Sequence, residues 1–188
     1  MIVLKTAREL ALMKEAGFIA AQALKLAGEA VEPGITTGEI DRLVHDFIVR
    51  QGAYPTFLKY NGYPASVCVS VNDEVIHGIP AKDRVIAHGD LVSIDLGATL
   101  NGYIGDTAAT FAAGDISPEA KRLSDTTRES LYEGIKAAVA GGRTGGIGAA
   151  ISQYCEGRGY SVVREYTGHG VGTNLHEDPS LPNYGLPG

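Results

Sequence analysis

The fold of this chain is decided by the 21-residue stretch LVSIDLGATLNGYIGDTAATF, positions 91–111. Two runs that mix apolar and small polar residues flank the pair Asn101-Gly102. An Asn-Gly pair between such runs is the strongest short-range signal for a β-hairpin with a two-residue turn. We therefore expect two antiparallel strands, one over 91–98 and one over 103–111.

A two-residue turn at this pair also fixes the register. Gly97 then lies opposite Asp106, and Asp95 lies opposite Ala108. Because side chains alternate along a strand, Asp95 and Gly97 share a face. Asp95 and Asp106 become diagonal neighbours on that face, with Cβ atoms roughly 7–8 Å apart or less. The opposite face suits a core, since it carries Val92, Ile94, Leu96, Ala98, Leu100, Tyr103 and Phe111.

Two neighbouring carboxylates repel each other unless something neutralises them. One cation, or two cations about 3.5–4 Å apart, would do so. The alternative is a pair of solvated acids on an exposed sheet face. Aspartate is disfavoured in the middle of strands, so the pattern favours a metal site at Asp95 and Asp106.

Two helices are expected before this hairpin. Thr6-Ala7-Arg8-Glu9 and Thr36-Thr37-Gly38-Glu39 both fit the capping box, in which Thr and Glu satisfy the free N–H groups of a helix start. The first helix should end before Glu32-Pro33-Gly34 and the second at Gly52. The alternating stretch 66–71 then predicts a strand.

Two further helices are expected after the hairpin. Ser117-Pro118-Glu119 predicts a helix start, and the helix should run to about Gly141. The next helix should span about Gly146 to Arg158. The second half of the chain thus repeats the order helix, helix, strands.

We expect an internal duplication, with half-repeats of about residues 1–113 and 114–188; convergent helix patterning is the alternative. A second copy of the 91–111 hairpin would fall beyond position 188. The chain is therefore expected to be one domain, residues 1–188, whose second half is incomplete, shortened at its C-terminus.

Composition narrows the functional class. The chain has 188 residues, a net charge of −6 and two cysteines, Cys68 and Cys155. Its acidic balance argues against bulk nucleic-acid binding. No apolar run is long enough for a membrane span, and charge appears too early for a signal peptide. We expect a cytoplasmic protein with no membrane partner and no specific nucleic-acid partner.

Histidines mark the other candidate positions. His169 lies between glycines in TGHGVG, residues 167–172, and His176 follows closely. Glycine on both sides lets the backbone present one imidazole, as a ligand or catalytic group requires. His45 is expected on a helix surface, and His88 in the turn 87–90.

The last histidine, His77, allows an alternative. A two-residue turn at Asn72-Asp73 would place Cys68 opposite His77 and make a Cys–His nucleophile pair conceivable. The chain lacks the local signatures of thiol proteases. Cys68 as a small apolar wall of a pocket is the favoured interpretation.

Five motifs carry a resemblance to a known family: GYPASVC (62–68), HGIP (77–80), DLVSID (90–95), GDT (105–107) and GHGVG (168–172). With these the chain resembles the bacterial type I methionine aminopeptidases of metallopeptidase family M24, over essentially its whole length. The resemblance implies an α+β pita-bread fold, a pseudo-twofold antiparallel sheet backed by helices. The implied activity is hydrolytic removal of the initiator methionine from peptides and nascent proteins.

The resemblance also implies the site. Asp95, Asp106 and His169 would be metal ligands, in a complete site of two divalent ions such as cobalt, manganese, iron or zinc. The family's other two ligands are glutamates nearer the C-terminus, and they have no counterpart here. We therefore expect the 188-residue chain alone to bind at most one metal ion tightly and to show little activity.

For the substrate, the resemblance assigns His77 and His176 as the two contacting histidines. Residues matching the methionine pocket are Tyr60, Tyr63 and Cys68, with Phe57 and Leu175 at positions where relatives vary. The implied partners are N-terminal methionines of peptides and nascent chains. Ribosome association is an open option, and a complete chain is expected to be a monomer.

Two alternative functions stay open from the sequence. One is another pita-bread peptidase that cuts before proline, although such enzymes usually carry an extra N-terminal domain. The other is a non-catalytic binding module that kept the fold and lost two ligands.

Overall fold

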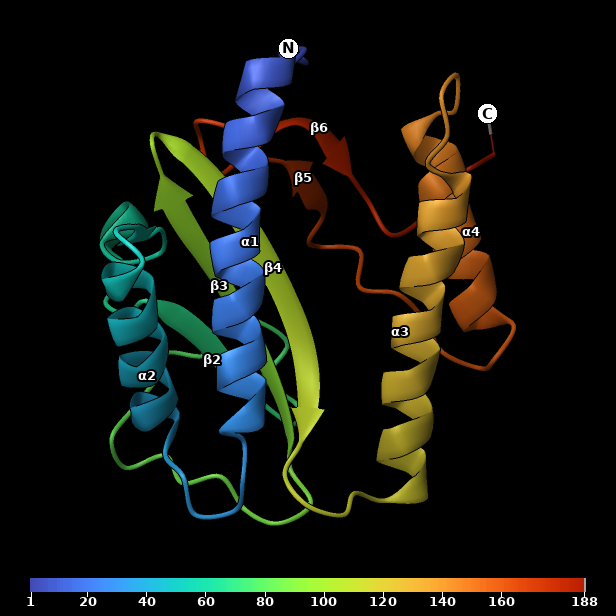
Figure 1. The fold of residues 1–188 in the computed structure, drawn as a ribbon. Helices are drawn as coiled ribbons and strands as arrows, with labels where there is room; N and C mark the ends of the chain where they lie inside the picture. The colour runs from blue at the N-terminus through green and yellow to red at the C-terminus, as the bar shows by residue number, and fades with distance from the viewer. Residues whose placement is uncertain (188) are drawn as a thin grey trace. The chain divides into compact units, whose positions relative to one another are not determined.

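The computed structural model describes residues 1–187, which divide into two compact units. The larger unit comprises Val3–Ile116 and Val171–Leu175. The smaller comprises Met1–Ile2, Ser117–Gly170 and the described residues from His176 on. Both units combine helices with antiparallel strands, as expected for the α+β class (Figure 1).

The sheet of the larger unit is built around one long strand. β3 (Leu91–Leu100) pairs with β1 (Tyr54–Pro55), β2 (Val67–Val71) and β4 (Tyr103–Ala112), always antiparallel. The turn residues Asn101 and Gly102 have φ of 52° and 80°. A two-residue turn of type I′ needs positive φ at both positions, so the predicted hairpin and its register are confirmed.

Helices α1 (Ala7–Glu29) and α2 (Thr37–Arg50) cover the apolar face of this sheet, and α1 runs along β3 and β4 (Figure 1). Both predicted capping boxes are present. Glu9 Oε2 accepts the Thr6 N–H at 2.7 Å, and Glu39 Oε2 accepts the Thr36 N–H at 2.9 Å. A one-turn 3₁₀ helix, η1 (Tyr60–Gly62), lies between β1 and β2.

Helix α1 approaches the sheet unusually closely because small residues line the contact. The helix is fully buried along Ala16, Ala20, Ala23 and Ala27. At one point along it, a Cβ built on Gly105 of β4 would lie 2.4 Å from the Cα of Gly17. Backbone therefore meets backbone at this crossing, and only glycine fits at position 105.

The expected hairpin around Asn72-Asp73 is wrong. Val71 N–H donates to the Glu74 carboxylate at 2.8 Å, so a side chain occupies the donor that a second strand would need. The chain then leaves the ladder and returns to β2 once, where Val69 N–H donates to Gly78 O at 2.9 Å. Cys68 consequently lies opposite Asp95 of β3, not opposite His77.

The smaller unit holds α3 (Pro118–Ala137), α4 (Thr144–Glu156), β5 (Gly168–Gly170) and β6 (Glu177–Leu181). Its element order matches the sequence prediction, and α3 packs along α4 (Figure 1). Helix α3 starts at the predicted Ser117 cap but ends before Gly141, because Ala138 already has non-helical ψ of 71°. The internal duplication itself stays a prediction.

No helix within the described residues has both the length and the apolarity that crossing a bilayer requires.

Candidate functional site

One face of the larger unit's sheet is polar. Paired residues share a face, so Cys68 and Asp95 lie together, as do Ser70 and Ser93. On β4, Asp106 lies opposite Gly97 and is the diagonal neighbour of Asp95. The opposite face packs into the core under α1 and α2. The β-ladder thus places the two carboxylates at diagonal positions of one face, as the predicted register requires.

Burial and these carboxylates both lower the acidity of the neighbouring thiol. Burial raises the pKa of Cys68 to about 11, and the negative charges of Asp95 and Asp106 act in the same direction. A thiol with such a pKa stays protonated at neutral pH and is a poor nucleophile. Together with the register, this argues against the Cys–His nucleophile alternative and for Cys68 as a wall.

The same charges provide a test of whether a metal ion fits here. Two carboxylates at diagonal positions of neighbouring strands concentrate negative charge on this face, and carboxylate oxygens are good ligands for divalent ions. Asp95 and Asp106 therefore fit a metal. Across residues 1–187 the structure assembles no group of three His, Cys, Asp or Glu side chains that could hold a metal ion. The full ligand set consequently stays a prediction.

His169 and His176 belong to the smaller unit. His169 lies in β5 and is half-buried, whereas His176 is exposed just before β6. Their ring centroids are 4.2 Å apart. The Nδ1 of His169 lies 3.0 Å from Gly170 O; because a carbonyl only accepts, this contact requires a proton on Nδ1.

Gly170, next to His169, allows β5 to approach the backbone of β6 closely. A Cβ on Gly170 would lie 2.5 Å from Asp178 O. The β5–β6 register shifts between His169 and Gly170, which indicates a bulge. Residues 168–170 of the motif are therefore part of a paired strand.

An apolar cluster lies beside the polar face. Four of the five predicted pocket residues gather there: Phe57, Cys68 and Leu175 are buried, and Tyr63 packs against them. Gly97 permits this, since a Cβ there would lie 3.2 Å from the Phe57 ring. Tyr60 is not part of the cluster; it lies on η1 and is 38% exposed.

His77 is exposed on the segment that follows β2. Tyr63 connects this segment to the strand, because its hydroxyl lies within hydrogen-bond distance of Val67 O (3.2 Å) and Gly78 O (3.1 Å). Burial raises the pKa of the Tyr63 hydroxyl far above its usual range, so it stays a donor.

Sequence reasoning missed the contacts that hold the start of β2. Asp41 on α2 accepts the N–H groups of Ser66 and Val67 at 2.7 and 3.2 Å. His45, expected on the helix surface, is half-buried and its Nδ1 lies 2.9 Å from Ser66 Oγ. These residues are far apart in sequence, and no local pattern indicates the contact.

His88 lies in the turn where it was predicted. Asp90 Oδ2 accepts the Ala87 N–H at 2.8 Å and closes the turn. The Nε2 of His88 accepts the Asp115 N–H at 3.3 Å.

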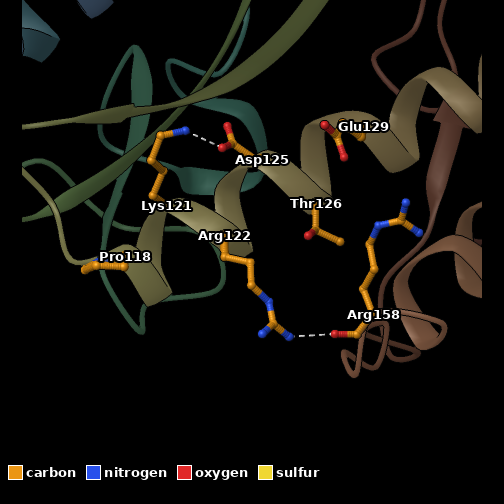
Figure 2. Close-up of a pocket in the computed structure, with 7 residues that line it drawn as sticks. All are labelled: Pro118, Lys121, Arg122, Asp125, Thr126, Glu129 and Arg158. Atoms are coloured by element: carbon orange, nitrogen blue, oxygen red, sulfur yellow. Dashed lines mark hydrogen bonds and ion pairs between the residues drawn. The ribbon is translucent and has the colours of Figure 1, made fainter.

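A depression of about 460 Å³ lies in the smaller unit (Figure 2). It is lined by Pro118, Lys121, Arg122, Asp125, Thr126, Glu129 and Arg158. Several of these side chains contact one another or the backbone: Lys121 forms an ion pair with Asp125, and Arg122 Nη2 donates to the backbone carbonyl of Arg158 at 2.7 Å. None of the predicted site residues lines it, so it carries no part of the proposed chemistry.

Comparison with known proteins identifies the family. A model described as metallopeptidase family M24 matches residues 11–187. The chain belongs to metallopeptidase family M24. This confirms the expected class of divalent-metal peptidase at the level of the family.

The M24 chain is 50% identical over 188 residues to a methionine aminopeptidase from Clostridium acetobutylicum, covering 100% of this chain and 75% of that relative. It is 51% identical to methionine aminopeptidase 1 of Bacillus subtilis, with the same coverage of 100% and 75%. The crystal structure of methionine aminopeptidase from Rickettsia prowazekii matches with a TM-score of 0.95 at 41% identity, covering 100% of this chain and 75% of that one. The resemblance and fold class predicted from the sequence are confirmed.

Proposed function

We propose that this M24 chain removes N-terminal methionine from peptides and nascent proteins. One observation carries the proposal: Cys68 belongs both to the apolar cluster and to the pair Cys68–Asp95 on the polar sheet face. An apolar wall suited to a thioether side chain would therefore lie directly beside Asp95, whose diagonal neighbour on β4 is Asp106. The names of the relatives support the same substrate.

The metal would be held by Asp95 and Asp106, with His169 as a third ligand through Nε2. We expect two divalent ions in a complete site; cobalt, manganese, iron and zinc all suit these donors. When bound, such ions acidify a water molecule and polarise a carbonyl. The two carboxylates supply negative charge that would offset the positive charge of the metal ions.

The protein side chains orient the substrate. The cluster of Phe57, Tyr63, Cys68 and Leu175 would hold the methionine side chain and exclude water from it. His77 and His176 would donate hydrogen bonds to the substrate and stabilise negative charge that develops during attack on the carbonyl. Tyr60, which lies outside this cluster, stays a candidate contact for the substrate.

The decisive experiment is cleavage of Met-Ala-Ser by the 188-residue chain with added Mn²⁺ or Co²⁺. An X-Pro peptide and a Leu-Ala-Ser peptide are matched controls. Selective release of methionine supports the proposal; preferential cleavage before proline would favour the alternative pita-bread peptidase. Metal binding without cleavage of any peptide would favour the binding module.

The 188 residues span 75% of the Clostridium relative, so the same assay is also run with that relative's remaining segment appended. We expect the isolated chain to bind at most one metal ion tightly and to cleave weakly, and the extended chain to bind two. Two tightly bound ions and strong cleavage by the isolated chain would contradict the five-ligand picture.

The cellular setting is part of the proposal. We infer that the chain acts in the cytoplasm, on nascent chains and in reach of the ribosome, and that a complete chain is a monomer. The net charge of −6 supports the absence of a specific nucleic-acid partner.

Replacing His77 by alanine is expected to lower kcat for Met-Ala-Ser by roughly 100-fold while leaving metal content and melting temperature unchanged. The reason is that His77 is exposed and would contact substrate rather than metal. Steady-state kinetics and metal analysis of the same preparation provide the measurement. An unchanged kcat refutes the role, and loss of bound metal would instead make His77 a ligand.

A further inference from the structure

The backbone directly after His77 is held by three hydrogen bonds. Gly78 N–H donates to Ser70 Oγ at 3.0 Å. Gly78 O accepts from Val69 N–H at 2.9 Å and from the Tyr63 hydroxyl at 3.1 Å. Two of the three partners are side chains on or beside the polar sheet face.

This anchoring matters because little else restrains His77. Residues 72–77 are all exposed, and within the described chain no hydrogen bond or ion pair involves the His77 ring. The direction of the imidazole therefore depends on the peptide that links residues 77 and 78.

Position 78 requires glycine for steric reasons, but glycine alone does not fix the backbone conformation there. A Cβ there would lie 2.2 Å from Val69 O, so the segment can approach β2 only with glycine. Glycine also has the greatest backbone freedom of all residues. Hydrogen bonds must supply the restraint that a side chain would otherwise give.

We propose that Ser70 is a positioning residue for His77: its hydroxyl fixes the Gly78 N–H and so the orientation of the imidazole toward the substrate. Ser70 is 4% exposed, so its side chain is enclosed by neighbouring atoms. Unlike Tyr63, it belongs to no predicted pocket position. The inference rests on the proposed function, because it needs His77 to act on substrate.

Ser70→Ala tests this, and Ser93→Ala is the matched control. Ser93 lies opposite Ser70 on the same sheet face, but its hydroxyl contacts Thr110 Oγ1 at 2.9 Å. In the ¹⁵N-glycine-labelled 188-residue chain, Ser70→Ala should raise the amide exchange rate of Gly78 roughly fivefold. The His77 imidazole signal should shift or broaden in this variant and stay in place in Ser93→Ala.

Kinetics separate positioning from stability. We expect Ser70→Ala to lower kcat for Met-Ala-Ser about tenfold with KM nearly unchanged, since misplacing a catalytic group affects the transition state more than binding. Ser70→Thr, which keeps the hydroxyl, should restore kcat. If Ser70→Ala melts early, Ser70→Cys keeps the volume and removes the strong acceptor.

Three results would overturn the inference. One is an unchanged Gly78 exchange rate. Another is faster Gly78 exchange with an unmoved His77 signal, and the third is an equal loss of kcat in Ser93→Ala. If the wild-type chain cleaves no peptide, the proposed function fails for this chain. The His77 signal then decides the positioning role: a shift in Ser70→Ala alone supports it, and no shift overturns it.

Discussion

Replacing Gly105 by alanine is expected to lower the free energy of unfolding of the larger unit by roughly 3 kcal/mol or more. The new Cβ would lie 2.4 Å from both the N and the Cα of Gly17, and 2.6 Å from the carbonyl carbon of Ala16. All three are backbone atoms, so no side chain can turn away to make room. Helix α1 or strand β4 must shift instead.

Gly17→Ala is the matched control at the same crossing. A Cβ on Gly17 meets nothing within 4 Å, and the residue lies inside α1. Alanine there should stabilise the unit by about 0.5–1 kcal/mol through helix propensity. Urea unfolding of the two variants measures both effects; equal stabilities would contradict the backbone contact.

Replacing Asp106 by asparagine is expected to reduce affinity for Mn²⁺ or Co²⁺ by at least about 100-fold, since even residues that only support a ligand contribute 10–100-fold. Activity on Met-Ala-Ser should fall in parallel. Asparagine keeps the shape of the side chain and removes one of the two charges on the sheet face.

Melting temperatures with and without metal show whether Asp106→Asn acts through metal binding or through the fold. Without metal, Asp106→Asn removes one of two neighbouring negative charges and keeps the shape of the side chain, so the melting temperature should change little. With metal, the variant should lose the increase that the wild-type chain gains from binding. Asp46→Asn, at an exposed position of α2, is the control and should change neither value. Unchanged metal affinity in Asp106→Asn would exclude Asp106 as a ligand.

The elements that sequence predicted well are those governed by neighbours in the chain. The 91–111 hairpin depends on a two-residue turn and on alternation, and its register followed from these alone. The segment after Val71 carries a similar turn signal but forms no hairpin. There the Glu74 side chain accepts the Val71 N–H in place of a second strand. The alternation of apolar and polar residues does not indicate this hydrogen bond.

In the candidate site, too, local features were predictable and tertiary contacts were not. The diagonal pair Asp95 and Asp106 was predictable because both residues lie on one hairpin. The contacts of His45 with Ser66 and of Gly78 with Ser70 form only when the helix or the 77–78 segment reaches β2. Their partners are set by tertiary packing, so no spacing rule could identify them.

The two capping boxes give the larger unit a particular response to acid. Hydrogen bonds from the Thr6 and Thr36 backbones lower the pKa of Glu9 and Glu39 below the ordinary value of 4.5. Their contribution is complete above that value and is lost as the pH falls through the lowered pKa. In the smaller unit, α3 is capped by the Ser117 hydroxyl, which does not titrate, and α4 has no side-chain cap. Acidification would therefore weaken the caps of α1 and α2, while the hydroxyl cap of α3 keeps its hydrogen bond.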